Sequence, residues 1–352
     1  MRVGIPRELK PKEGRVGLIP AAAAELARRG HEVWVETQAG VQSGYPDALY
    51  QAVGCRIAKN HRELFENSEL VIKVKEPIAE DLDCLARHHL LFCYLHLAPV
   101  PKLTEALVRI GLTAIAFETV EENRRLPLLA PMSDIAGRLS IQIGTHLLHQ
   151  PEGGKGILLG GVTAARRGRV TIVGAGVAGG SAAEVAAALG AHVTVFDLDV
   201  DKLEKMRQLG PNVTALYAHA EDVARSVAQA DLVVGAVLVT GEKAPHVISK
   251  TMVQSMQPGS VVVDISVDQG GCIESTVPTT YEKPTYVWEG VTHFTVTNMP
   301  GAVPRTSSQA LSAAIAPYAL RLADGSWRAQ ESLVRGVNVE NGRIVHPALL
   351  KS

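Results

Sequence analysis

A glycine-rich turn near the middle of the chain constrains the fold more than any other feature. Residues 169–179 read as a short apolar strand that runs into the spacing G-x-G-x-x-G. An alanine-rich stretch follows, and then a second apolar run, His192–Phe196, which ends beside Asp197. Strand, glycine turn, helix, strand and acid in this order predict the first βαβ unit of a doubly wound sheet.

The same turn predicts a binding site for a nicotinamide dinucleotide. Gly174 permits a tight turn, Gly176 lets the backbone approach a pyrophosphate, and Gly179 lets the helix pack against the strand. The predicted helix begins at Val177 and Ala178, whose end of the helix directs backbone N–H groups at the phosphates. A glycine turn without any ligand is the alternative.

The acid after the second strand bears on the choice between NAD and NADP. Asp197 lies 18 residues beyond Gly179, where a carboxylate can accept hydrogen bonds from ribose hydroxyls and repel a 2′-phosphate. We therefore predict NAD as the cofactor.

Composition narrows the class of protein. A length of 352 residues favours two domains, and a formal charge of −1 gives no reason to expect nucleic acid or a membrane surface as a partner. No apolar run approaches ~20 residues, and the first residues lack the apolar region of a signal peptide. The cysteines show no C-x-x-C pair, which indicates buried thiols in a reducing compartment, so we expect a cytoplasmic protein. These cysteines are Cys55, Cys84, Cys93 and Cys272.

Short apolar runs alternate with helical patterns along the whole chain, which predicts parallel sheets covered on both faces. We expect two Rossmann-like doubly wound α/β domains with a cleft between them. The substrate domain comprises 1–128 plus 307–352, the NAD-binding domain comprises 129–306, and closure by a hinge is expected near 128 and 306. The predicted strands outside the glycine unit are Val3–Ile5, Glu32–Glu36, Leu70–Val74, Leu90–Leu95, Thr113–Phe117, Leu232–Val237 and Val261–Ile265, and the main predicted helices are Ala21–Arg29, Lys102–Arg109, Ser133–His149 and Ser308–Leu322.

Three polar residues follow strands of the first domain at their carboxyl ends, where doubly wound sheets bind ligands. Lys75 follows the predicted strand ending at Val74 and could bind a carboxylate or polarise a carbonyl. His96 follows the next strand, and its ordinary pKa suits proton transfer near neutrality. Arg15 lies in the loop after the first strand and could clamp a carboxylate. The alternatives are a surface lysine, a turn-capping histidine and a solvated loop charge.

Other charged residues near these strands are assigned differently. Lys73, His88 and His89 are interpreted as structural. In the second domain Asp268 lies beyond a strand and can reach the cleft, whereas Asp264 ends that strand and is expected to support the turn.

Several blocks in order make the chain resemble the alanine dehydrogenase family, which also holds the soluble NAD-binding subunit of proton-translocating transhydrogenase. The resemblance covers nearly the whole length. The blocks are Met1-Arg-Val-Gly-Ile-Pro-Arg-Glu, Glu13-Gly-Arg15-Val, Val74-Lys75-Glu-Pro77, Tyr94-Leu-His96-Leu-Ala98, Met132-Ser-Asp-Ile-Ala-Gly-Arg138, Gly235-Ala-Val-Leu-Val239 with Lys243-Ala-Pro245, Asp268-Gln-Gly-Gly271 and Asn298-Met-Pro-Gly-Ala-Val-Pro-Arg-Thr306.

The resemblance implies a role for each matching residue. Arg15 and Lys75 match the positions that hold the substrate carboxylate and carbonyl, His96 matches the acid/base, and Asp268 matches the acid beside the reacting carbon. Further positions match contacts to the cofactor. They are Ser133 and the glycine turn for the phosphates, Asp197 for the adenosine ribose, and Lys202, Leu238 and Asn298 for other cofactor contacts.

The family implies reversible, NAD-dependent oxidative deamination of L-alanine to pyruvate and ammonia, without a metal, by a homo-oligomer for which we expect a hexamer. Another amino acid, an opine-type reductive amination, a transhydrogenase subunit and a non-catalytic NAD-binding sensor are the alternatives. Two features depart from the family. His219 stands where a small hydroxyl residue is expected near the adenine, and Arg166 and Arg167 occupy a stretch where a proline is common, which predicts a surface loop.

Overall fold

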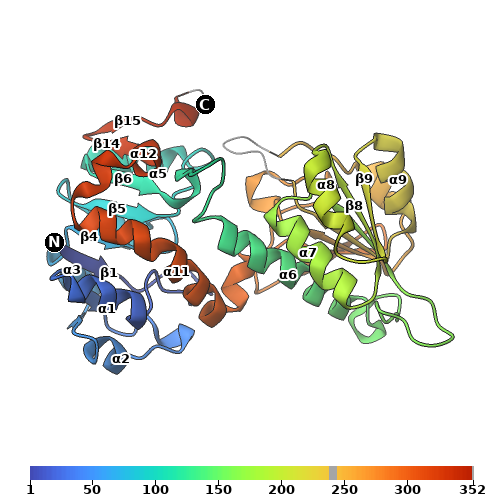
Figure 1. Ribbon diagram of the computed structural model, residues 1–352, viewed down its shortest axis with the longest axis horizontal. Coiled ribbons are helices and arrows are strands. Elements are labelled where there is room, and N and C mark those ends of the chain that lie inside the picture. The colour runs from blue at the N-terminus through green and yellow to red at the C-terminus, as the bar shows by residue number, and fades with distance from the viewer. Residues whose placement is uncertain (238–243, 351–352) are drawn as a thin grey trace. The chain divides into compact units, whose positions relative to one another are not determined.

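The computed structural model describes residues 1–237 and 244–350. The chain forms two compact units, of which unit 1 consists of Met1–Met132 and Gly301–Ser352, and unit 2 of Ser133–Pro300. Figure 1 shows unit 2 as an insertion, because the chain leaves unit 1, builds unit 2 and returns. The boundaries inferred from the sequence, at 128 and 306, lie a few residues from these transitions.

Unit 1 is built on an eight-stranded sheet in the order β15-β14-β6-β5-β4-β1-β2-β3. The strands from β6 to β3 run parallel, and their winding reverses between β1 and β4. This is the order of a doubly wound sheet, in which ligands bind beyond the carboxyl ends at the reversal. The strands are β1 (Arg2–Ile5), β2 (Glu32–Glu36), β3 (Arg56–Ala58), β4 (Leu70–Ile72), β5 (Leu90–Cys93), β6 (Thr113–Ala116), β14 (Val337–Glu340) and β15 (Arg343–Ile344).

Unit 2 repeats the plan in a seven-stranded sheet of order β12-β13-β11-β10-β7-β8-β9. All neighbours except β12 pair in parallel, and the winding reverses between β7 and β10. The strands are β7 (Arg169–Val173), β8 (His192–Asp197), β9 (Val213–Tyr217), β10 (Leu232–Gly235), β11 (Val261–Asp264), β12 (Thr285–Trp288) and β13 (Val291–Phe294).

Helices cover these sheets because the central strands are apolar on both faces. Every residue of β4, β10 and β11 is buried, as expected for strands that need cover on both sides. In Figure 1, α1 and α11 lie side by side over the sheet of unit 1, and α7 and α8 lie over the sheet of unit 2. The helices of unit 1 are α1 (Pro20–Arg28), α2 (Asp47–Gln51), α3 (His61–Glu66), α4 (Ala79–Leu82), α5 (Pro101–Ile110), α11 (Pro304–Ala323) and α12 (Glu331–Arg335), those of unit 2 are α7 (Val177–Ala188), α8 (Val200–Arg207), α9 (Ala220–Gln229) and α10 (Lys250–Gln254), and α6 (Ala130–Leu147) spans the boundary.

The prediction of parallel sheets is wrong at the sheet edges. All the predicted strands are present, but β12, β14 and β15 add antiparallel pairs. Two hairpins account for three of the edge strands and have two-residue turns, Glu289-Gly290 and Asn341-Gly342, in which φ is positive at both residues. Such turns match the twist of paired strands, and Asn-Gly is a strong sequence signal for them.

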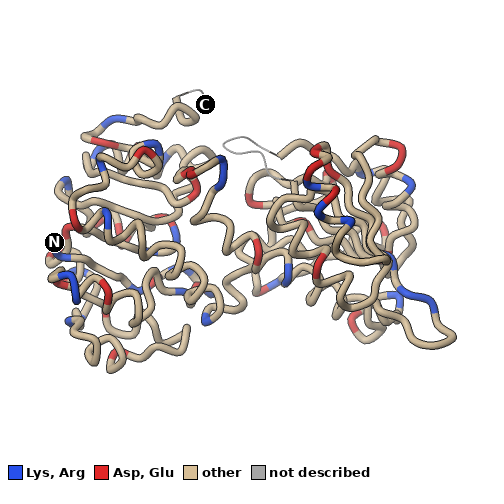
Figure 2. Tube along the Cα trace, viewed as in Figure 1, with Lys and Arg blue, Asp and Glu red and all other residues tan. Residues whose placement is uncertain are grey.

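The cysteines, the surface charges and the loop before β7 can be compared with what the sequence predicts. Cys84 is partly exposed and the other three cysteines are buried, all four as free thiols. Figure 2 shows charges of both signs interspersed over each unit, and Arg166 and Arg167 lie exposed in the loop before β7, as predicted. Within residues 1–237 and 244–350, no helix has the length and apolar character needed to cross a membrane.

Candidate active site

Two of the predicted substrate residues follow the strands between which the sheet of unit 1 reverses its winding. Arg15 lies in the irregular segment after β1, and Lys75 lies three residues beyond the end of β4. Arg15 is only 3% exposed, and Lys75 is largely covered. The alternative readings of a solvated loop charge and a surface lysine are therefore wrong for these two side chains.

Arg15 carries a buried charge that its own segment neutralises. Its Nε lies 2.7 Å from Oε1 of Glu13, and its Nη2 lies 2.5 Å from Oε2 of the same carboxylate. Burial by itself would lower the pKa of Arg15, but the hydrogen bonds and the charge of Glu13 raise it above its usual value. Nη1 donates to Sδ of Met132 at 3.2 Å, and a thioether is a weak acceptor. A carboxylate oxygen would be a stronger partner for this nitrogen.

Lys75 presents an amine whose proton is held less tightly than usual. Burial lowers the pKa of Lys75, and the neighbouring charge of Arg15 lowers it further. Among the described residues, its Nζ makes neither a hydrogen bond nor an ion pair. Its backbone is held by Glu8, whose Oε1 accepts from the N–H of Val74 at 2.6 Å and from that of Lys75 at 3.4 Å. The site thus offers a positioned amine next to a guanidinium.

His96 lies three residues beyond β5 in a strained backbone conformation. Its φ is +46°, in the left-handed region that a non-glycine residue adopts at some energetic cost. Its N–H donates to Oε1 of Glu118 at 2.6 Å, which holds the turn, and its Nδ1 lies 4.0 Å from the same oxygen. The side chain is 27% exposed. A strained conformation persists only where the surrounding structure holds it, and such residues are often found at functional sites.

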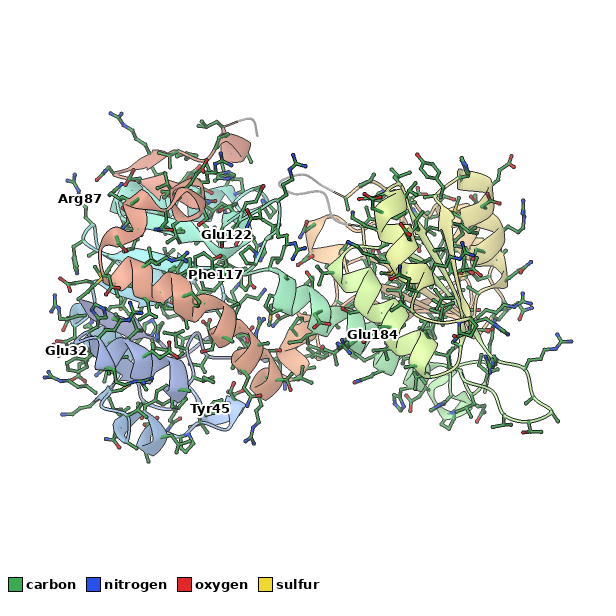
Figure 3. All side chains as sticks on the ribbon, viewed as in Figure 1. Glu32, Tyr45, Arg87, Phe117, Glu122 and Glu184 are labelled. Carbon is green, nitrogen blue, oxygen red and sulfur yellow. The ribbon has the colours of Figure 1, made fainter. Side chains whose placement is uncertain are left out.

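Tyr94 and Glu118 were missed by reasoning from the sequence. The Tyr94 ring stacks on His96 with centroids 5.8 Å apart, and its hydroxyl donates to the carbonyl of Leu128 at 2.5 Å. Burial raises the pKa of Tyr94 and the charge of Arg15 opposes that rise, so Tyr94 lies near both Arg15 and His96. Phe117, labelled in Figure 3, contacts the Tyr94 ring edge-on at 5.0 Å. A sequence signal for Tyr94 does exist. Side chains two residues apart lie on the same side of an extended segment, so Tyr94 could have been placed beside His96.

A buried charge network surrounds Lys73, which directly follows β4. Nζ of Lys73 lies 2.6 Å from Oδ2 of Asp81 and 3.7 Å from Oε2 of Glu8. His61 joins the other oxygen of Asp81, at 3.2 Å, to Glu36, at 2.8 Å. Burial disfavours the charged imidazole, but these two carboxylates outweigh it and raise the pKa of His61 to about 9. No group of three or more His, Cys, Asp or Glu side chains in the described chain is placed to hold a metal ion.

The glycine turn of unit 2 has the geometry that a dinucleotide requires. Gly174 has φ +101°, and a Cβ added to Gly179 would lie 1.7 Å from the carbonyl oxygen of Gly174. A Cβ added to Gly176 would meet nothing within 4 Å, so the backbone there is open to a pyrophosphate. Helix α7 begins at Val177, and no side chain caps it. The first N–H groups of a helix have no partner within the helix, so those of Val177 and Ala178 can donate to a phosphate. These residues fit the phosphates of NAD or NADP.

Two further predicted cofactor residues lie beside this turn. Asp197 ends β8, and its Oδ2 accepts from the N–H of Ala175 at 2.6 Å. Ser133 lies one turn before Gly137 on α6, and a Cβ on Gly137 would lie 2.1 Å from the carbonyl oxygen of Ala178. Residues four apart share a helix face, so Ser133 lies on the face of α6 that approaches α7 at Gly137.

The other predicted positions of unit 2 are more scattered. Lys202 in α8 forms an exposed ion pair with Asp199 at 3.7 Å. Asp268 lies exposed in the 3₁₀ turn Val267–Gln269, and Asn298 directly precedes the 3₁₀ turn Met299–Ala302. Leu238 lies outside the described residues.

Asp264 supports the turn after β11, as expected. It is fully buried and accepts from the backbone N–H groups of Ser266, Cys272 and Ile273 and from the hydroxyl of Thr276. Burial raises its pKa. These partners all lie within the turn that follows β11.

The similarity of this chain to known proteins extends over its whole length. Residues 4–136 match the model of the alanine dehydrogenase/PNT N-terminal domain, and residues 140–347 match that of the C-terminal domain. Alanine dehydrogenases from Bacillus subtilis and Geobacillus stearothermophilus are 45% and 46% identical to it, covering 100% and 99% of this chain and 94% and 95% of theirs. A solved L-alanine dehydrogenase structure superposes with a TM-score of 0.95 at 46% identity, covering 100% of this chain and 98% of that one. The chain belongs to the alanine dehydrogenase/PNT family.

Proposed function

We propose that this chain catalyses the reversible oxidative deamination of L-alanine to pyruvate and ammonia with NAD. The observation that carries the proposal is a pair of neighbouring cations at the winding reversal of unit 1, the buried Arg15 and the largely covered Lys75. The Tyr94 ring stacks on His96 and lies near Arg15, which brings His96 to the same part of the unit. Membership of the family and the alanine dehydrogenases among its relatives support the same reaction.

The two cations act on the substrate's acidic end. Arg15 binds the carboxylate, because a carboxylate oxygen is a better acceptor for Nη1 than the Met132 thioether. Lys75 donates from its amine to the substrate oxygens and polarises the carbonyl of pyruvate. Their combined positive charge favours a small anionic substrate and holds Cα in one orientation.

His96 moves the proton that deamination requires. Bound NAD supplies the acceptor for the hydride that leaves Cα. His96 takes a proton from the water that attacks the resulting iminium carbon, and it returns a proton as ammonia leaves. Asp268 contributes a negative charge that stabilises the developing cationic centre. Glu118 and Tyr94 keep the imidazole oriented during both transfers.

We infer NAD rather than NADP from Asp197. Its carboxylate is fixed at the glycine turn by the N–H groups of Ala175 and Asp199, at 2.6 and 2.9 Å. A negative charge held there accepts from ribose hydroxyls and repels a 2′-phosphate. Gly174, Gly176, Gly179 and Ser133 are assigned to the phosphates, and Lys202 and Asn298 to further contacts.

A cytoplasmic homohexamer stays a prediction that rests on the family resemblance. Helix α11 buries half of its twenty residues within unit 1, so its outer face is what remains to contact another subunit. Light scattering during size-exclusion chromatography measures the number of subunits.

The function is tested by following NADH or NADPH formation at alkaline pH with L-alanine, glycine, L-serine, L-lysine and L-ornithine. Turnover confined to L-alanine with NAD is expected. Turnover with another amino acid would reassign the substrate. A protein that binds NADH but turns over no amino acid would instead be an opine-forming enzyme or an NAD-binding sensor, and pyruvate with primary amines would separate those two.

A further inference from the structure

The segment that carries Arg15 has no regular secondary structure, yet its backbone is held on both sides of that residue. The carbonyl of Gly14 accepts from Oγ of Ser43 at 2.7 Å, and the N–H of Val16 donates to Oγ of Ser308 at 2.9 Å. The two hydroxyl oxygens lie 2.8 Å apart, and both serines are fully buried. Two hydroxyls therefore bracket the Arg15 peptide.

The two hydroxyls link the Val16 N–H to the Gly14 carbonyl through a continuous series of hydrogen bonds. A hydroxyl has a single proton to donate, and Ser308 already accepts from the N–H of Val16. Ser308 then donates to Ser43, and Ser43 donates to the carbonyl of Gly14, which is nearer than its second acceptor, the carbonyl of Pro304 at 3.1 Å. Linked hydrogen bonds strengthen one another inside a protein, so loss of either hydroxyl weakens the hydrogen bond that the other one still makes.

The serines supply something that Glu13 does not. The Glu13–Arg15 pair orients the guanidinium relative to its own segment, because both residues belong to it. Ser43 lies in the 3₁₀ turn Val41–Ser43, and Ser308 lies near the start of α11, so the serines tie that segment to the fold. The fit is close, since a Cβ added to Gly14 would lie 2.7 Å from Oε1 of Gln42.

We propose that Ser43 and Ser308 are positioning residues that fix Arg15 for recognition of the substrate carboxylate. The proposal rests on the proposed function. The chain re-enters unit 1 at residue 301, and α11 begins three residues later at Pro304. Ser308 therefore gives this C-terminal part of unit 1 a role in substrate binding. Tyr45, labelled in Figure 3, contacts the same end of α11 by accepting from Nε2 of Gln309 at 2.9 Å.

A matched control lies one turn further along α11. Ser312 is also fully buried, and its Oγ accepts from the N–H of Ile19 at 3.0 Å. Ser312→Ala thus removes the same group from the same helix, but the bond that it breaks lies four residues from Arg15. Ser308→Ala and Ser312→Ala should both lower the Tm, since each leaves one backbone N–H, of the buried Val16 or the partly buried Ile19, without its acceptor.

Steady-state kinetics of pyruvate reduction with ammonia and NADH separates the two serines. Ser308→Ala and Ser43→Ala should each raise the KM for pyruvate about tenfold without changing the Kd for NADH, and the double variant should match either single one. Ser312→Ala should leave the KM for pyruvate within about twofold of the wild type. In an Arg15→Lys background, Ser308→Ala should add nothing, because the group that it positions is gone.

Each outcome is decisive. An equal KM for pyruvate in Ser308→Ala and Ser312→Ala, or an undiminished effect of Ser308→Ala in the Arg15→Lys background, overturns the proposal. If the wild type turns over neither L-alanine nor pyruvate, the proposed function fails instead. Hydrogen exchange at the Val16 amide then tests the hydroxyl chain separately: faster exchange in Ser43→Ala, in which Val16 keeps its own acceptor, supports it, and unchanged exchange overturns it.

Discussion

The candidate site of unit 1 and the glycine turn of unit 2 are built from different kinds of group. The turn of unit 2 is made of backbone, with Gly174, Gly176 and Gly179 bringing main-chain atoms to a point where a side chain would not fit or would block a ligand. The site of unit 1 is made of charged side chains that are buried and held by other side chains, as Glu13 holds Arg15. A backbone site fails when an atom is added, whereas a side-chain site fails when a partner is removed.

The difference also concerns distance along the chain. The glycine turn and Asp197 lie within one βαβ unit and contact each other there, although the backbone of Ala236 also packs against Gly174. The Arg15 segment depends on Ser43 and Ser308, and His96 depends on Glu118. Mutation should therefore separate cofactor binding from chemistry by unit.

The largest expected effect is in unit 1, at His96. His96→Asn should lower kcat by about two to four orders of magnitude while leaving NADH affinity unchanged, because it removes the acid/base and asparagine tolerates positive φ. Stopped-flow NADH binding and steady-state turnover measure the two effects. His88→Asn, at an exposed histidine of the same unit, is the control. Near-normal turnover in His96→Asn would remove His96 from the mechanism.

The glycine turn of unit 2 should respond to added atoms. Gly179→Ala should destabilise the protein by about 3 kcal/mol and abolish tight NADH binding, because its Cβ would meet the carbonyl oxygen of Gly174. Gly176→Ala should leave stability unchanged, since nothing lies within 4 Å, yet weaken NADH binding by filling the open space. Urea unfolding and NADH titration distinguish them. Unchanged NADH affinity in Gly176→Ala would mean that the pyrophosphate does not approach there.

The free energy of unfolding of unit 1 should depend on pH through the protonation of His61. Its folded pKa of about 9 lies above the ordinary value of 6.5, so the protonated ring stabilises the fold fully below pH 6.5, and this contribution is lost as the pH rises through 9. The loss should reach up to about 3 kcal/mol. Urea unfolding at pH 6, 7.5 and 9.5 should show a smaller decline in His61→Gln than in the wild type or in His88→Gln. Identical slopes would contradict the charge network.

The smallest effect concerns the choice of cofactor at Asp197. Asp197→Asn keeps an acceptor for the N–H of Ala175 but removes the charge, so the NADP/NAD ratio of kcat/KM should rise about tenfold. Asp197→Gly removes both and should weaken binding of either dinucleotide as well. If the ratio does not move in Asp197→Asn, the carboxylate only braces the turn.

Reasoning from the sequence named the candidate site residues but not the groups that hold them. The rule that ligands lie beyond the carboxyl ends of parallel strands identified Lys75 and His96, although β4 and β5 end two residues earlier than predicted. It missed Tyr94 and Glu118, because nothing local indicates which carboxylate meets the backbone of His96. It also left Arg15 open between a clamp and a solvated charge, since burial of an irregular segment depends on distant partners.

The sequence by itself determined the alternation of strands and helices, the glycine turn and its acid, and membership of the family. These follow from periodicity, from the conformational freedom of glycine and from local order along the chain. Only the tertiary structure decided that Arg15 is buried against Glu13, that Glu8 holds the backbone of Lys75 and that two serines bracket the Arg15 peptide. Glu8 and the two serines lie far along the chain from the backbone groups that they hold, so these contacts exist only once the sheet of unit 1 has set the register and packing of its helices.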